Sequence, residues 1–218
     1  MESFSNVIQP ETEEVKAREH LLKGRWKREF FKNNNPIVLE LGCGKGEYTV
    51  GLATKFPYNN YIGIDIKGAR IWRGAKTAFE NKIPNVSFLR TRIEFIDSFF
   101  SEGEVEEIWI TFPDPHPKRR DAGKRLTSPH FLNSYRSIMK NRGIIHLITD
   151  NRELFDYTQR IVEHNNLEVI TATDDLYSGK IENEILSTRT HYENIFLNQG
   201  IKINYLSFRL DKNRNIED

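Results

Sequence analysis

Ile37-Val-Leu-Glu-Leu-Gly-Cys-Gly-Lys-Gly46 is the stretch that decides the fold. Its first five residues are mostly apolar and predict a buried strand, and a helix is expected directly after the glycines, from Glu47 to Phe56. Glycines let the backbone come close to a ligand, and the start of a helix aims N–H groups at it. A strand, a glycine turn and a helix in this order predict a ligand site lined by Gly42 and Gly44.

Strands and helices alternate through the rest of the chain. Further strands are expected at residues 61–65, 86–90, 108–112, 143–149, 167–173 and 201–210. Helices are expected at residues 68–81, 93–100, 129–139 and 151–164, and residues 174–200 are expected to form a loop that becomes helical near His191. This alternation predicts an α/β fold with a seven-stranded, mostly parallel doubly wound sheet and a late antiparallel strand.

The same pattern divides the chain into three segments. Residues 1–36 would form an N-terminal arm with a charged helix over residues 11–31, residues 37–210 the single α/β domain, and residues 211–218 a tail. We expect residues 1–10 and the tail to be poorly ordered. A length of 218 residues is enough for one sizeable core.

Charge and cysteine content narrow the class of protein. The formal net charge of +1 excludes a general polycation, so any affinity for nucleic acid must come from local clusters. The single cysteine, Cys43, rules out a disulfide within the chain and fits a reducing compartment, so we expect a cytoplasmic protein. No apolar run is long enough to span a membrane, and the six histidines show no metal-binding spacing.

Two acids at strand ends indicate which nucleoside cofactor would bind. Glu40 lies near the end of the first strand, and Asp65 ends the second. An acid in the place of Asp65 can accept both ribose hydroxyls, although acids at strand ends are commonly only helix caps. A carboxylate at Glu40 would attract the sulfonium and amine of S-adenosyl-L-methionine and repel a dinucleotide pyrophosphate. Gly-x-Gly-x-Gly preceded by such an acid is the form seen in methyltransferases that use this cofactor.

A second stretch, residues 108–125, carries the candidate chemistry. The strand at residues 108–112 stops at Pro113-Asp114-Pro115, where the prolines hold one carboxylate just past its end. Residues 118–125 then place five cations and one Asp in eight positions, a density suited to phosphate. Ligands of open α/β sheets bind beyond the carboxyl ends of the strands, so Asp114 and this cationic loop are expected to border the site. The alternative is an ordinary solvated loop.

The chain resembles the bacterial tRNA (guanine-N7-)-methyltransferases of the TrmB type. The matching motifs run in the family's order and are Val38-Leu-Glu-Leu-Gly-Cys-Gly-Lys-Gly46, Tyr61-Ile-Gly-Ile-Asp65, Phe112-Pro-Asp-Pro115, Lys118 with the basic run, His146-Leu-Ile-Thr-Asp150 and Thr190-His-Tyr-Glu193. The resemblance implies a Rossmann-like class I methyltransferase fold with S-adenosyl-L-methionine as cofactor. It also implies that tRNA is the substrate, methylated at N7 of a guanine in the variable loop.

The resemblance further implies roles for individual residues. Asp114 would be catalytic and would also lie against the cofactor. The other cofactor-binding residues would be Glu40, Gly42, Gly44 and Asp65. The guanosine would be held by Lys118, Asp150, Thr190, His191, Tyr192 and Glu193, and the RNA contacts would be Arg119, Arg120, Lys124 and Arg125. Without the resemblance, the Asp150–Asn151 pair would be taken for a helix N-cap.

The chain departs from the family at four positions. It has His116 where the family usually has Trp, Asp121 where it has His, and Gly123 where it has Lys. Fewer cations would weaken the grip of the loop on RNA, and His116 could stack on the target base or simply pack. Arg92 stands where the family often has an acid near the adenine. A cation cannot accept the adenine amine, so backbone near Ile93 would have to replace that contact.

Other readings of the sequence remain open. An amino-group methyltransferase would carry Asp/Asn-Pro-Pro-aromatic in the place of Phe112-Pro-Asp-Pro115, whereas the second aromatic is missing here. A non-catalytic RNA-binding protein conflicts with the intact glycine turn and the two acids. A dehydrogenase would have to bind a nicotinamide cofactor. A monomer and a homodimer are both compatible with the sequence.

Overall fold

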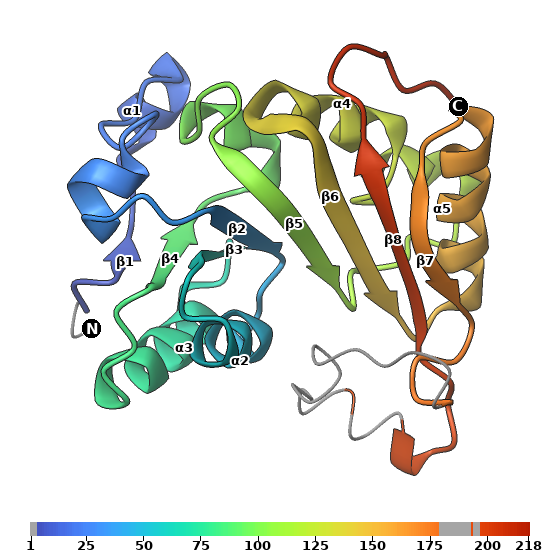
Figure 1. Ribbon diagram of the computed structural model, residues 1–218, viewed down its shortest axis with the longest axis horizontal. Helices are drawn as coiled ribbons and strands as arrows, with labels where there is room; N and C mark the ends of the chain where they lie inside the picture. The colour runs from blue at the N-terminus through green and yellow to red at the C-terminus, as the bar shows by residue number, and fades with distance from the viewer. Residues whose placement is uncertain (1–3, 179–192, 194–196) are drawn as a thin grey trace.

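The computed structural model describes residues 4–178, 193 and 197–218, which form one sheet with helices on both faces (Figure 1). The order of its eight strands is β1-β4-β3-β2-β5-β6-β8-β7. β8 runs antiparallel to both β6 and β7, and the other neighbouring pairs are parallel. The strands are β1 (Val7–Ile8), β2 (Ile37–Leu41), β3 (Asn60–Asp65), β4 (Val86–Arg90), β5 (Val105–Thr111), β6 (Met139–Thr149), β7 (Val169–Thr173) and β8 (Asn204–Leu210).

The predicted fold class is confirmed, and β8 is the late antiparallel strand. The predicted strand at residues 86–90 is found unchanged as β4. The predicted strand at residues 37–41 is likewise found unchanged as β2. The remaining predicted strands are found with ends shifted by up to four residues; β6, for example, begins at Met139 instead of Gly143. β1 adds an eighth strand by pairing with β4 at the sheet edge, so the expectation that residues 1–10 are poorly ordered was wrong for Val7–Ile8.

Helices cover both faces of the sheet and create two apolar cores. α2 and α3 lie over one face, in the core that contains Val38, and α4 and α5 lie over the other, in the core that contains Leu39. Successive residues of a strand point to opposite faces, so the apolar run of β2 serves both cores. The helices are α1 (Thr12–Ala17), α2 (Glu47–Lys55), α3 (Gly68–Glu80), α4 (Pro129–Ile138) and α5 (Arg152–His164), with a π-helix at Trp26–Phe31 and 3₁₀ helices at Ile93–Ser98 and Arg119–Lys124.

The N-terminal segment differs from the single helix predicted over residues 11–31. α1 ends because Arg18 adopts a left-handed conformation (φ 55°), and the chain turns before the π-helix begins at Trp26. Trp26 is fully buried, stacks on Phe100, and donates its indole N–H to the Phe99 carbonyl at 2.8 Å. Burial of this aromatic side chain against the core overrides the helical pattern of the surrounding charged residues.

The C-terminal tail is also more ordered than predicted. Ile216 is 2% exposed and packs in the core beneath α4 and α5. The Asn133 side chain bonds both the N–H and the C=O of Ile216, and the Asn165 side chain bonds the N–H and the C=O of Glu217. The tail therefore closes one end of this core.

Candidate active site at the carboxyl ends of β2, β3 and β5

The strand order places a topological switch point between β2 and β5. From β2 the chain builds outward through β3 and β4 on one side and through β5 and β6 on the other, so the connections leave the two strands in opposite directions. A crevice is expected beyond the carboxyl ends at such a point. A hollow of ≈ 100 Å³ lies there and is lined by Glu40, Gly42, Cys43, Gly44, Lys45, Glu47, Tyr48, Arg70, Thr111 and Phe112. The glycine turn and the start of the Pro-Asp-Pro segment thus border the same hollow.

The glycine turn leaves room for a ligand at two positions. Gly42 and Gly44 have φ values of 75° and 55°, a region that only glycine adopts without strain. A Cβ on Gly42 would meet no atom within 4 Å, and one on Gly44 only the Gly42 carbonyl oxygen at 4.0 Å. Gly46 is different, because its Cβ would lie 2.5 Å from the Phe88 ring. Gly42 and Gly44 therefore expose backbone to the hollow, whereas Gly46 is needed for packing.

Glu40 is buried in the floor of the hollow and holds its walls together. Its carboxylate accepts the Thr49 backbone N–H at 2.8 Å, the Thr49 hydroxyl, and the Thr111 hydroxyl at 2.7 Å. Burial raises the pKa of Glu40 to about 7 in spite of these three hydrogen bonds, which lower it. No cation pairs with it among the described residues, so a cationic ligand in the hollow would stabilise its ionised form and an anionic one would not.

Asp65 supports the glycine turn from the end of β3. One carboxylate oxygen accepts the Gly44 N–H at 3.0 Å, and the other accepts the Lys67 N–H at 2.8 Å. An ionised carboxylate has about four lone-pair sites, so two remain for hydroxyl groups of a ligand. This bond to the turn, which sequence reasoning did not foresee, fixes the place of Asp65 relative to the hollow.

The Pro-Asp-Pro segment is a strained turn that presents Asp114 to solvent. Phe112 and His116 both have positive φ (47° and 43°), and such residues cost of order 1–3 kcal/mol each. The side chain of Asp114 is 74% exposed, and its only hydrogen bond among the described residues comes from the His116 N–H at 3.2 Å. The turn thus holds a largely unshielded carboxylate next to the hollow, beside the His116 ring, whose Nδ1 lies 3.9 Å from it.

Arg125 packs against this turn and donates hydrogen bonds to it. It is 9% exposed, donates to the carbonyls of Pro115 (3.2 Å) and His116 (3.1 Å), and lies 4.3 Å over the Tyr157 ring. Its head group is mostly engaged by the protein, and its contact with RNA stays a prediction. The local sequence does not distinguish Arg125 from the exposed cations beside it. Its partners are the carbonyls of residues nine and ten positions earlier and the Tyr157 ring on α5.

The rest of the cationic loop faces solvent. Asp121 forms ion pairs with Lys124 at 2.7 Å and with Arg120 at 3.8 Å. Lys118 and Arg119 are exposed, and neither is in an ion pair with any residue that the structure describes. These two side chains are therefore the most available phosphate-binding groups of the loop.

Asp150 lies at the end of β6, beside the same turn. The backbone N–H of Phe112 bonds the carbonyl of Ile148, two residues before Asp150. Asn151, and not Asp150, caps α5 by accepting the Leu154 N–H at 2.8 Å. Asp150 is half-buried and makes no side-chain hydrogen bond or ion pair with a described residue, so its carboxylate stays available for a ligand.

Glu193 occupies an unexpected place. Thr190, His191 and Tyr192 lie outside the described residues, whereas Glu193 is fully buried. It accepts the Tyr48 hydroxyl at 3.0 Å and the Tyr177 hydroxyl, and burial raises the pKa of Tyr48 well above its usual range, so Tyr48 stays protonated. Tyr48 belongs to α2 and borders the hollow. Glu193 therefore links Tyr48 and Tyr177 in the fold, a contact that its sequence motif does not reveal.

Two other features lie apart from this site. Arg92 is exposed and forms an ion pair with Glu94 at 2.9 Å, so it offers no acceptor to an adenine.

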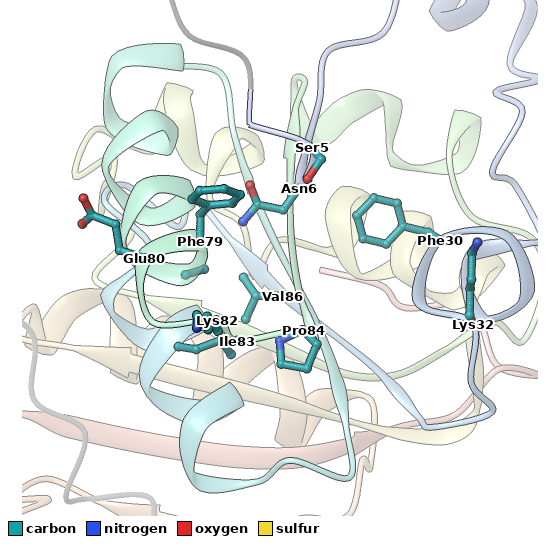
Figure 2. A pocket seen from close by; sticks show the side chains of 11 residues that line it. Ser5, Asn6, Phe30, Lys32, Phe79, Glu80, Lys82, Ile83, Pro84 and Val86 are labelled. Atoms are coloured by element: carbon teal, nitrogen blue, oxygen red, sulfur yellow. The ribbon is translucent and has the colours of Figure 1, made fainter.

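A second hollow, of ≈ 910 Å³, lies before the start of β4, and Phe30 and Phe79 face it (Figure 2). Its charged residues are Lys32, Glu80 and Lys82, and they include none of the strand-end acids. It is larger than the hollow at the strand ends, but the residues of the predicted site do not line it.

Comparison with known proteins agrees with this geometry. A family model described as "Putative methyltransferase" matches residues 34–206. The chain is 54% identical to a tRNA (guanine-N(7)-)-methyltransferase from Porphyromonas gingivalis, over 96% of this chain and 86% of that protein. The chain belongs to the family of tRNA (guanine-N(7)-)-methyltransferases. It is also 50% identical to the protein of that name from Christiangramia forsetii (96% and 94% covered) and 36% identical to that from Listeria welshimeri (88% and 87%).

Solved structures support the fold of this family member. The 16S rRNA methyltransferase KamB matches with a TM-score of 0.61 at 14% identity, covering 96% of this chain and 95% of that one. An antibiotic-related methyltransferase matches with a TM-score of 0.60 at 15% identity, covering 84% and 91%. At such low identity these matches concern the fold alone. Among the helices that the structure describes, none has the length and apolar character needed to cross a membrane.

Proposed function

We propose that the chain transfers a methyl group from S-adenosyl-L-methionine to N7 of a guanine in the variable loop of tRNA. The observation that carries the proposal is the position of Asp114, which is exposed and lies two residues after Phe112, a lining residue of the hollow that also contains the buried Glu40. Membership of a family whose relatives are named for this reaction supports it. The variable-loop location rests on the motif resemblance.

The hollow suits the proposed cofactor. Bound S-adenosyl-L-methionine supplies an electrophilic methyl group on a sulfonium. Glu40, with its pKa raised to about 7 by burial, is a carboxylate that lacks a cation. Gly42 and Gly44 leave backbone open for close approach, and Asp65 retains lone pairs for ribose hydroxyls. A dinucleotide pyrophosphate would instead meet the repulsion of Glu40.

Guanine N7 needs no general base. It carries an in-plane lone pair and no proton, so catalysis depends on holding it in line with the methyl group, an effect that can supply about 7–11 kcal/mol. The purine gains positive charge as the methyl group arrives. Asp114 accepts the guanine N1–H and amino hydrogens and stabilises this charge, and Asp150 shares the guanine edge. Lys118 helps to hold the guanosine, and Arg119, Arg120 and Lys124 contact RNA phosphates.

The target base must leave its stack to reach the hollow, which favours a site with binding groups on several sides. Thr190, His191 and Tyr192 supply further contacts to the guanosine, a role that rests on the resemblance. Glu193 acts by anchoring to Tyr48 and Tyr177. We further propose a cytoplasmic location, which the single Cys43 fits, and either a monomer or a homodimer.

Labelled methyl transfer to bulk unmodified tRNA, followed by nucleoside analysis, tests the reaction and its product together. The expected product is 7-methylguanosine. An N-methylated adenosine or cytidine would establish an amino-group methyltransferase instead, and cofactor binding with no transfer to any tRNA would establish a non-catalytic RNA-binding protein.

A further inference from the structure

A second group of cations begins at the hollow, where Lys45 and Arg70 line it, and continues along α3, whereas the loop at residues 118–125 follows β5. We propose that Lys45, Lys67, Arg70 and Arg73, here called the α3 ridge, bind the phosphate backbone of the tRNA, so that the substrate is held on both sides of the hollow. This inference rests on the proposed function and extends its RNA contacts to Lys45 of the glycine turn and to three cations outside the sequence motifs.

The side chains of the ridge are exposed and unneutralised. All four residues are exposed, and none is in an ion pair with a described residue. Lys76, one turn further along α3, differs because it lies 3.7 Å from Glu80. Of the nearby acids, Glu40 and Asp65 are buried and engaged in the hydrogen bonds described above, which leaves Glu47 as the acid of the hollow nearest to solvent.

Local structure aligns the ridge with the site. Arg70 and Arg73 are three residues apart and share the outer face of α3, whose inner face is buried through Ile71, Gly74, Ala75 and Ala78. Lys67 is the N-cap of α3, two residues after Asp65 at the end of β3. Lys45 and Arg70 line the same hollow as Phe112, the residue that leads into the Pro-Asp-Pro turn. The ridge therefore begins at the rim and runs away from it along α3, which lies beside α2 (Figure 1).

The chemistry of the ridge fits an RNA backbone. The whole chain has a net charge of only +1, yet it places unpaired cations on both sides of one hollow. A folded RNA offers a line of phosphates that can span both surfaces, whereas a small ligand could reach only the residues at the rim. Lys45 and Arg70 could alternatively bind the carboxylate of the cofactor, since they line the hollow. Lys67 and Arg73 do not line it and separate the two explanations.

The test is the double variant Lys67→Glu/Arg73→Glu, with Lys16→Glu/Arg160→Glu as the control. The control reverses two exposed cations, on α1 and α5, that have no ion pair with described residues. The ridge variant should raise KM for unmodified tRNA about ten-fold or more, and the slope of log KM against log salt should fall by about 2, one per lost phosphate contact. kcat at saturating tRNA and the Kd for S-adenosyl-L-methionine should stay within about two-fold of wild type.

Binding of unmodified tRNA by fluorescence anisotropy, measured on the same variants, separates this inference from the proposed reaction. If the wild type makes no 7-methylguanosine, the reaction is wrong, while weaker tRNA binding by the ridge variant alone still supports the ridge. A ridge variant that binds tRNA as well as the control does would overturn the inference. A weakened cofactor Kd with unchanged tRNA binding would also overturn it, by assigning these cations to the cofactor.

Discussion

Protonation of Glu40 should control cofactor affinity. Burial raises its pKa from the ordinary 4.5 to about 7, so about one-eleventh of the free protein is ionised at pH 6 and about ten-elevenths at pH 8. If S-adenosyl-L-methionine binds the ionised form, its apparent Kd should be about ten-fold higher at pH 6 than at pH 8. Binding at pH 7 should release about half a proton from Glu40.

Isothermal titration calorimetry at pH 7, in two buffers with different ionisation enthalpies, measures this proton release. Glu40→Gln is the matched control, because it keeps the shape of the side chain and retains any contribution from the amine of the ligand. The variant should bind S-adenosyl-L-methionine more weakly. Its apparent Kd should lack the ten-fold change between pH 6 and pH 8 that the titration of Glu40 causes in the wild type. Equal proton release by the variant and the wild type, with parallel pH profiles, would refute the reasoning.

The stability of the free protein should show the opposite dependence on pH. The pKa of Glu40 is raised in the folded state, so its contribution is fully present below about pH 4.5 and is lost as the pH rises through about 7. The shift corresponds to about 3 kcal/mol over this interval. The free energy of unfolding of the wild type should therefore fall relative to that of Glu40→Gln between pH 5 and pH 8. Urea denaturation at several pH values measures it, and a constant difference would contradict the assigned burial.

Three further substitutions test the site. Asp114→Asn should lower kcat by about 100-fold or more and leave the cofactor Kd within about two-fold, because the exposed carboxylate acts on the purine; equal turnover would end its catalytic role. Arg125→Met should destabilise the protein by about 1–3 kcal/mol and raise KM for tRNA, because the carbonyls of Pro115 and His116 lose their donor; unchanged unfolding curves would contradict this. Tyr48→Phe removes one donor from the buried Glu193 and should cost about 1–3 kcal/mol in urea denaturation, with unchanged stability as the contrary result.

Sequence patterns were sufficient where one local signal decided the structure. The run at β2, its glycines and the following helix were predicted closely, because strand burial, left-handed glycines and helix start all lie within a few residues. Asp114 was likewise placed by the prolines on either side of it. The N-terminal segment was not predictable in this way, since the packing of Trp26 on Phe100 joins residues 74 positions apart (100 minus 26).

The roles that sequence missed depend on distant partners. Arg125 looks like its exposed neighbours, and only the fold brings Tyr157 beneath it and the carbonyls of the strained turn against it. Glu193 lies in a motif that suggests substrate binding, and its burial against Tyr48 links residues 145 positions apart. Buried tyrosines in a helix are normally explained by packing, so sequence gave no signal for this anchor.

The most direct test is a crystal structure of the protein with S-adenosylhomocysteine and guanosine bound. The ribose hydroxyls of the cofactor product should lie within hydrogen-bonding distance of Asp65, with guanine N7 facing the sulfur and the Asp114 carboxylate at the guanine edge. Binding of the nucleosides elsewhere, such as in the hollow beside the start of β4, or a guanine whose N7 faces away from the sulfur, would contradict the account.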